Sequence, residues 1–279
     1  MEWHALRGGG KRPQFRNANL HLAAWLPSRL AAKKSAFTLA EVLITLGIIG
    51  VVAAITLPTL VANYQKQVWV NQLKKTYTTL NEGFKQMAAS EGCTTLQCAD
   101  ISWDSNLVGF DFTKAKTKEK FVKTFKLENV YVGGVPSNSI YNYKIKMLSG
   151  EEWNFSDTAV VDNEISLVGT TSNGEIMSFT GAMSGPIVFV DINGLKSPNT
   201  VGRDIFVFGI FDYNDTVMVT PFYSKKFYEA IVAEGRAGEI SEESRIQDVN
   251  DNCSKTAPDF IDNCYCAEKI IMDGWKMNY

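Results

Sequence analysis

The distribution of charged and apolar residues divides the chain near its N-terminal end. No charged residue lies between Glu41 and Lys66, and this uncharged run is longer than the ~20 residues that cross a bilayer as a helix. Beyond it, apolar residues recur at helical spacing with charged residues between them, at Leu73, Tyr77, Leu80, Phe84 and Met87. The pattern predicts one long helix, apolar all round in its first half and amphipathic in its second. Gly47, Gly50 and Pro58 are expected to interrupt or loosen it.

After Ser90 the pattern changes to short apolar runs separated by turn residues. These runs predict strands at Tyr141–Leu148, Trp153–Phe155, Ala159–Val168, Glu175–Phe179, Ile187–Ile192, Ile205–Phe211 and Val217–Phe222. Short helices are predicted at Lys114–Leu127, Phe227–Gly235 and Cys264–Gly274, and loops at Glu91–Asn106 and Gly238–Asn252. Because strands joined so closely pair antiparallel, the predicted fold class is α+β, with the long N-terminal helix packed on an antiparallel sheet.

Glu41 is the residue of the apolar run that most needs an explanation. An ionised carboxylate at the edge of hydrocarbon requires a partner, and charges in such positions are usually functional. If the chain were cut between Ala36 and Phe37, the new amine would lie one helical turn from Glu41. A neighbouring copy could then present its amine to this carboxylate, so Glu41 is predicted to be an assembly contact.

The residues around this position resemble the type IV prepilin signal. Lys33-Lys34-Ser35-Ala36 precedes Phe37-Thr38-Leu39-Ala40-Glu41 and the apolar helix. The resemblance to type IV pilins and type II secretion pseudopilins implies a pilin-like fold, cleavage after Ala36 by a prepilin peptidase, and N-methylation of Phe37. It also implies that Glu41 is required for methylation and assembly, and that Pro58 is a helix-loosening proline. Ala36 stands where the family usually has glycine.

The segment before Phe37 is basic, with Arg7, Lys11, Arg12, Arg16, Arg29, Lys33 and Lys34 against one acid, Glu2. Basic flanks stay on the cytoplasmic side of a membrane span. We therefore expect a removed leader at 1–36, a transmembrane and assembly helix at 37–65, and a periplasmic globular domain at 66–279. The residues before about Arg29 are interpreted as an unstructured extension or a misassigned start. The expected location is the inner membrane, in a single pass, followed by a periplasmic or surface filament.

Histidine and cysteine limit the chemistry of the remaining chain. Both histidines, His4 and His21, lie in the expected leader, which excludes His-dependent catalysis and His-ligated zinc from the mature chain. The protein is therefore predicted not to be an enzyme.

The five cysteines all follow the apolar run, where disulfides are allowed. Cys93 could pair with Cys98, and Cys253 with either Cys264 or Cys266, and at least one structural disulfide is expected. The sequence contains no CxxC pair, so the spacing of the cysteines does not indicate a metal site.

One loop has the composition of a cation site. Asp191, Asn193, Asn199 and Asp204 lie between two apolar strands, and calcium takes six to eight oxygen ligands. The segment resembles the calcium-binding loop of major pseudopilins, so calcium is the one candidate cofactor. The alternative is that Asp and Asn build turns, with Arg203 pairing with Asp191 or Asp204 and locking the loop without metal.

Together these features indicate a structural subunit of a type II secretion pseudopilus or a type IV pilus-like filament. Its expected partners are copies of itself, other pilin-like subunits, the prepilin peptidase and the inner-membrane assembly platform. One alternative is a minor pilin for DNA uptake or adhesion that uses the basic face of Lys114–Lys126, although DNA is not the expected partner. The other alternative is a membrane-anchored periplasmic enzyme.

Overall fold

The computed structural model describes residues 37–101, 103–104, 109–136, 138–155, 166–182, 185–257 and 260–279. The chain divides into two compact units after Val52. The fold is α+β, as predicted, because the second part of a long N-terminal helix packs against a six-stranded antiparallel sheet.

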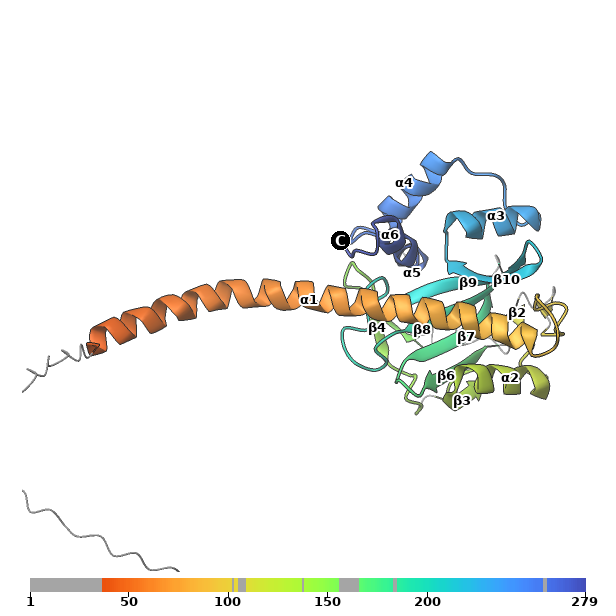
Figure 1. Ribbon diagram of the computed structural model, residues 1–279, viewed down its shortest axis with the longest axis horizontal. Coiled ribbons are helices and arrows are strands. Elements are labelled where there is room, and N and C mark those ends of the chain that lie inside the picture. The colour runs from red at the N-terminus through yellow and green to blue at the C-terminus, as the bar shows by residue number, and fades with distance from the viewer. Residues whose placement is uncertain are drawn as a thin grey trace, which may run out of the picture. The chain divides into compact units, whose positions relative to one another are not determined.

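Helix α1 runs from Leu39 to Ala89 (Figure 1). The expected interruption by glycine and proline is therefore wrong for this structure, since Gly47, Gly50 and Pro58 all lie within the helix. Pro58 has no N–H to donate to the carbonyl four residues earlier, and loosening of α1 in an assembly stays a prediction.

The inward face of α1 is confirmed. The predicted positions Leu73, Leu80, Phe84 and Met87 are buried, and Tyr77 packs against the edge of the same core. Thr76 lies on this face and donates its hydroxyl hydrogen to the buried carboxylate of Glu175 at 3.0 Å. The apolar residues at helical spacing therefore form one stripe of α1, and this stripe faces the sheet as predicted.

The sheet has the strand order β10-β9-β8-β7-β6-β3, and every neighbouring pair is antiparallel. Strands β6 to β10 form a meander in chain order, and β3 adds to the edge of β6. The six strands are β3 (Leu127–Val132), β6 (Leu167–Thr171), β7 (Ile176–Ala182), β8 (Gly185–Asp191), β9 (Ile205–Tyr213) and β10 (Thr216–Pro221). Two small hairpins pair β1 (Trp103–Asp104) with β2 (Gly109–Phe110) and β4 (Lys144–Lys146) with β5 (Glu152–Asn154).

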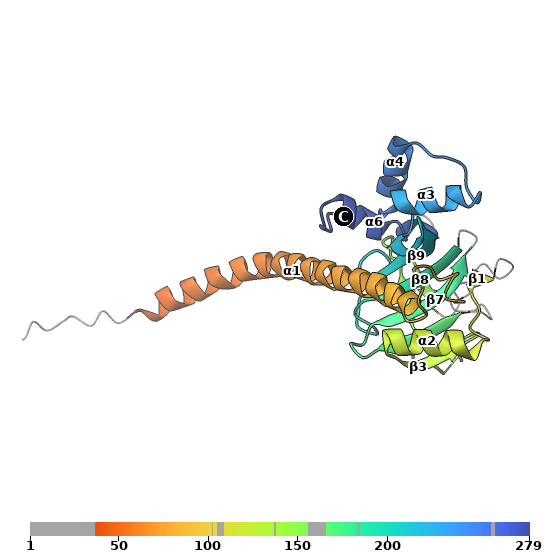
Figure 2. The same ribbon diagram turned by 45° about the vertical axis from the view of Figure 1, so that its right-hand side comes forward.

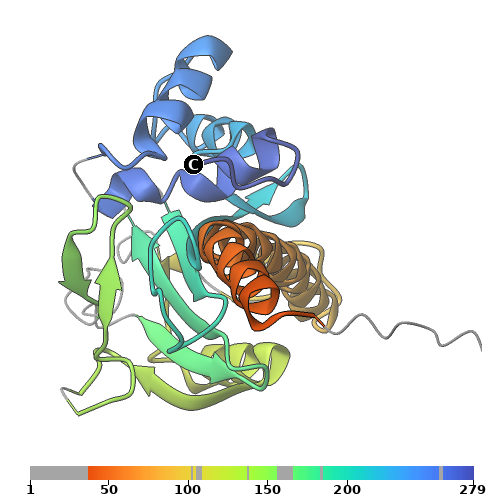
Figure 3. The ribbon, with the colours of Figure 1, turned by 90° about the vertical axis from the view of Figure 1, so that its left-hand side faces the viewer.

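Both faces of the sheet are buried, each by different elements. Along β8, Val188 and Val190 join the core beneath α1, whereas Ile187 and Phe189 join a second core on the opposite face. Helix α2 (Ala115–Phe125) adds to the first core, and the β4–β5 hairpin and α3 (Lys225–Ala233) add to the second. Figure 3 shows α1 on one side of the sheet and the β4–β5 hairpin on the other. Burial of both faces explains why β8 and β9 are apolar at successive positions instead of alternating.

Two predicted elements differ from the structure. The helix predicted at Lys114–Leu127 ends earlier, because Lys126 has a left-handed conformation (φ 51°) and Leu127 begins β3, which was not predicted. The loop predicted at Gly238–Asn252 is wrong, since Glu242–Asn252 forms helix α4. Its N-cap, Ser241, accepts a hydrogen bond from the backbone N–H of Ser244, and acidic residues occupy its first turn.

The predicted strands are otherwise present with changed ends. The strand predicted at Tyr141–Leu148 is limited to β4, and the one at Ala159–Val168 falls partly outside the described residues, with β6 beginning at Leu167. The C-terminal part contains two further short helices, α5 (Phe260–Asn263) and α6 (Cys266–Met272).

Two disulfides close local loops. Cys93 bonds to Cys98, and Cys253 bonds to Cys266, so the structure decides the alternative that the sequence left open. Cys264 is buried and belongs to neither disulfide. The first disulfide closes the turn after α1, and the second ties the end of α4 to α6.

Candidate functional site

Thr38 and Glu41 form the first turn of α1 together. The backbone N–H of Glu41 donates to the Thr38 hydroxyl oxygen at 3.2 Å, and the backbone N–H of Thr38 donates to Glu41 Oε2 at 2.8 Å. The Thr38 hydroxyl also donates to Glu41 Oε2 at 2.8 Å. This reciprocal pattern is a capping box, which satisfies N–H groups that have no partner within the helix. The Glu41 carboxylate is therefore oriented by its own chain before any partner approaches.

The Thr38–Glu41 pair was missed as a local feature, although the sequence contains its signal. A threonine followed three residues later by glutamate, immediately before an apolar run, marks a helix start. The carboxylate thus has a local structural role in addition to the assembly role predicted for it.

The helix surface that follows is apolar and uncovered. Within the described residues, α1 is the helix long and apolar enough to cross a membrane, and its apolar window is not buried by the chain. The large exposed apolar side chains of this surface are Phe37, Leu39, Val42, Leu43, Ile44, Leu46, Ile48, Ile49, Val51, Val52, Ile55, Leu57, Leu60, Val61 and Tyr64. Soluble monomers rarely expose an apolar surface of this extent, so lipid or other protein must cover it.

The predicted processing position lies at the boundary of the described chain. Phe37 is described and its side chain is 84% exposed, whereas Ala36 and the basic residues before it lie outside the described residues. Cleavage after Ala36 therefore stays a prediction.

Comparison with known proteins identifies this segment. Residues 31–57 match the family model of the prokaryotic N-terminal methylation motif. The chain carries a prepilin-type signal. The signal is that of type IV pilins and pseudopilins, and it includes Phe37, Glu41 and most of the apolar half of α1. The chain matches no curated protein and no solved structure.

The prepilin-type signal supports a type IV pilin-like or pseudopilin protein in general. Proteins with this signal are generally structural, assemble with other pilin subunits and are processed by a prepilin peptidase. The apolar part of α1 fits the membrane anchor of such proteins.

The loop between β8 and β9 brings the four candidate calcium ligands together around a buried carboxylate. Asp204 Oδ2 accepts from Asn193 Nδ2 at 3.0 Å and from the Asn199 backbone N–H at 2.8 Å, and Asp204 Oδ1 accepts from the Thr200 backbone N–H at 2.5 Å. Asp191 Oδ2 accepts from the Tyr143 hydroxyl at 2.9 Å. Both aspartates are buried, with exposed fractions of 1% for Asp191 and 0% for Asp204.

This arrangement does not fit a calcium site. N–H groups face the carboxylate oxygens of Asp204, whereas calcium requires those oxygens to face the ion. The described residues contain no group of three or more acidic, histidine or cysteine side chains placed to hold a metal. The hydrogen bonds that hold the loop around Asp204 come from neutral donors and not from the predicted Arg203.

Burial raises the pKa of Asp204 to about 6, although backbone N–H groups of Thr200 and Asn199 oppose the shift. Burial and the charge of Asp204 also raise the pKa of Asp191 well above its usual range. The unfolded pKa of an aspartate is about 3.9. The folded chain therefore binds more protons than the unfolded chain between these pH values, and its stability decreases as the pH rises through them.

We expect the free energy of unfolding of the Asp204→Asn variant to depend less on pH than that of the wild type. The free energy of unfolding of the wild type should fall by about 1–3 kcal/mol more than that of the variant between pH 4 and pH 7, because only the wild type ionises a buried group at this position. Urea unfolding of the detergent-solubilised chain, followed by tryptophan fluorescence, measures the difference. Parallel pH profiles would contradict the raised pKa, and Asp215→Asn on an exposed turn is the control.

The lysine-rich segment proposed as a DNA-binding face is helix α2, and part of it is already neutralised. Lys120 pairs with Glu91 at 2.9 Å and also donates to the Ala99 carbonyl, and Lys116 approaches the same glutamate at 3.5 Å. Lys114 lies 3.6 Å from Asp111. The contacts of Lys116 and Lys120 anchor α2 to the segment that follows α1, whereas the Lys114 contact is local to the start of α2. Together they give a structural reason for three of the six lysines from Lys114 to Lys126.

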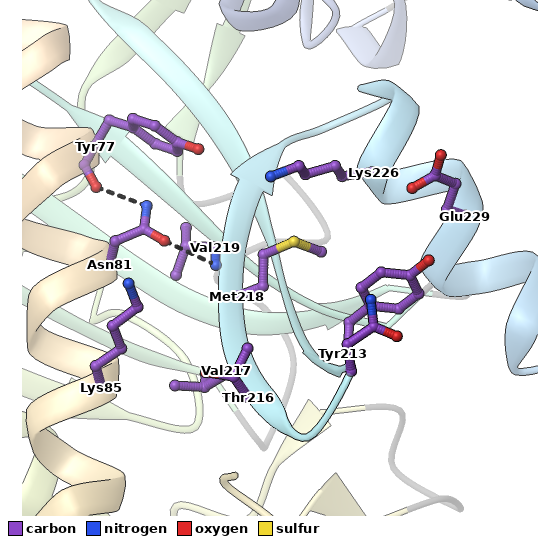
Figure 4. Close-up of a pocket in the computed structure, with 11 residues that line it drawn as sticks. Tyr77, Asn81, Lys85, Tyr213, Thr216, Val217, Met218, Val219, Lys226 and Glu229 are labelled. Atoms are coloured by element: carbon purple, nitrogen blue, oxygen red, sulfur yellow. Dashed lines mark hydrogen bonds between the residues drawn. The ribbon is translucent and has the colours of Figure 1, made fainter. Parts of the chain in front are cut away.

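A cavity of about 450 Å³ lies beside strand β10, between α1, the β9–β10 turn and α3 (Figure 4). Asn81 projects from α1 into it, donating to the Tyr77 carbonyl at 3.0 Å and accepting from the Val219 backbone N–H at 3.2 Å. The Val217 backbone N–H donates to the Thr94 carbonyl at 3.0 Å. Two outward N–H groups of this edge strand are thus already bonded, which disfavours the addition of another strand here.

Proposed function

We propose that the protein is a structural subunit of a type II secretion pseudopilus or a type IV pilus-like filament. It is inserted in the inner membrane, cleaved after Ala36 and assembled through the first half of α1. The observation that carries the proposal is the prepilin-type signal leading into an uncovered apolar helix with a single carboxylate at its start.

The chemistry of assembly follows from the first turn of α1. Cleavage before Phe37 would create an amine, and a neighbouring copy displaced along a bundle axis could bring its amine to Glu41. A charge in a low-dielectric bundle is costly without a partner, so only a register that pairs the amine with Glu41 would be stable. The capping box keeps Glu41 at the helix start, where such a pair would form.

The domain organisation that goes with this function is a removed leader at 1–36, an assembly helix at 37–65 and a periplasmic domain at 66–279. The single-pass orientation is supported by the basic residues before Phe37. The two disulfides suit a domain that works in an oxidising compartment.

Cleavage is tested by mass spectrometry of the mature N-terminus in a host with a prepilin peptidase. We expect the N-terminal residue to be Phe37 carrying an N-methyl group. Ala36→Gly, which restores the family's usual residue, should be cleaved at least as well, whereas Ala36→Leu should accumulate the uncleaved chain. An intact Ala36–Phe37 bond in the wild type would refute the proposed function.

A further inference from the structure

Two segments of the globular unit are rich in charges of opposite sign. From Lys114 to Lys126 the chain contains six lysines and one glutamate, and from Glu239 to Asp251 it contains five acidic residues and one arginine. The first segment is α2 with its caps, and the second includes α4.

On α2, packing and ion pairs leave three lysines for a partner. Thr117, Phe121 and Phe125 form the buried stripe of the helix. Lys118, Lys123 and Lys126 are exposed, and none of them forms an ion pair with any residue that the structure describes. We call these three residues the basic face.

On α4, the single base is turned inward. Arg245 is buried and pairs with Glu268 of α6 at 2.9 Å and with Glu242 at 2.8 Å. Glu239, Glu243 and Asp251 remain exposed, and no ion pair involves them within the described part of the chain. We call these three residues the acidic face.

The two faces lie at opposite ends of the sheet. Helix α2 packs beside β3 and β6, whereas α3 packs on β9 and β10 and α4 packs on α6. Figures 1, 2 and 3 all show α2 and α4 on opposite sides of the second half of α1. The faces therefore cannot neutralise one another within one chain.

We propose that the basic face on α2 of one copy binds the acidic face on α4 of the next copy. A two-fold contact would need both faces in one interface, and the two faces lie on opposite sides of the domain, so the complementary arrangement is head-to-tail. Such heterologous contacts generate rings or open helical series. This inference rests on the proposed filament and names the surface by which neighbouring globular domains would recognise each other.

Ion pairs between exposed faces contribute more to the specificity of an assembly than to its affinity. Exposed ion pairs contribute little individually and are screened by salt, but complementary patches fix register and disfavour wrong partners. The apolar half of α1 would supply most of the assembly free energy, and the α2–α4 contact would set which sides of the domains meet.

Charge reversal with rescue tests the contact in the full-length chain. Lys118→Glu/Lys123→Glu and, separately, Glu243→Lys/Asp251→Lys should each lower the assembled fraction about tenfold, equal to about 1.4 kcal/mol. Combining all four substitutions should restore it. Lys144→Glu/Lys276→Glu changes the charge equally at exposed positions outside both faces and should assemble like the wild type. Resistance of each variant to chymotrypsin, whose aromatic cleavage sites none of these substitutions changes, shows that the domain has folded.

A crosslink gives a direct readout. Copies with Lys118→Cys and copies with Glu243→Cys, expressed together, should yield a disulfide-linked dimer, whereas Lys144→Cys with Lys276→Cys should not. Two results together would overturn the α2–α4 contact but leave the filament proposal standing. The charge-reversal variants would assemble like the control, and the cysteine variants would form filaments without the α2–α4 crosslink. DNA retention that is lost in the lysine variant while assembly is unchanged would overturn it in favour of nucleic-acid binding. Failure of the wild type to assemble would overturn the filament proposal itself.

Discussion

Replacing Glu41 with alanine is expected to leave membrane insertion intact and to reduce filament incorporation by about a hundredfold or more. Removing one member of a buried charge pair costs about 3–5 kcal/mol, because the other charge is left without a partner. In the proposed assembly the orphaned charge would be the amine at Phe37 of a neighbouring copy. The membrane fraction and the sheared filament fraction, quantified by immunoblot, measure insertion and assembly separately.

Thr38 provides the matched control for this experiment. Thr38→Ala removes the hydroxyl of the capping box but keeps the Glu41 carboxylate. Thr38→Ala should destabilise the start of the helix by about 1 kcal/mol, the usual cost of a lost N-cap. Thr38→Ser, which keeps a hydroxyl, should restore the stability of the helix start. If Thr38→Ala abolished assembly as completely as Glu41→Ala, helix capping would explain the role of the carboxylate and the intersubunit pair would be wrong.

The second large effect is expected at Phe84, which joins α1 to the sheet. Its ring is fully buried, and its centroid lies 5.2 Å from that of Phe125, 5.6 Å from that of Phe121 and 6.1 Å from that of Phe179. Phe84→Ala should lower the free energy of unfolding by about 3–5 kcal/mol, because the lost contacts leave a cavity that rigid rings cannot fill. Urea unfolding of the solubilised chain measures the change.

Two comparisons separate packing from general damage. Phe84→Leu keeps much of the volume and should cost clearly less than Phe84→Ala. Ile140→Ala removes an apolar side chain that is 47% exposed and should change the free energy of unfolding by less than about 0.5 kcal/mol. Equal destabilisation by Phe84→Ala and Ile140→Ala would show that α1 is not held to the sheet through this cluster.

The sequence predicted the elements with strong periodicity and missed those defined by local conformation or partners. The buried stripe of α1 was predictable because helical spacing repeats over many residues. Strand β3 was missed because the chain reverses at Lys126, a lysine with φ 51°, and nothing about lysine signals that conformation. Helix α4 was missed because its composition is polar, although Ser241 followed by Glu242 and Glu243 is a helix-start signal.

The candidate site shows the same division. Thr38 and Glu41 are three residues apart, so their capping box is a local interaction that the sequence determines by itself. The prepilin-type signal and the uncharged run are likewise local, and they suffice to predict a helix long and apolar enough to cross a membrane and a pilin-like protein in general.

Only the tertiary structure decided the contacts between distant segments. It paired Cys253 with Cys266, directed N–H groups onto Asp204 in place of a cation, and turned Arg245 inward to Glu268, leaving an acidic surface. It also placed α2 beside β3 and β6 and α4 on α6, on opposite sides of the second half of α1. The physical reason is that periodicity and capping depend on neighbours along the chain, whereas the burial and pairing of a polar group depend on whichever segments the fold brings against it.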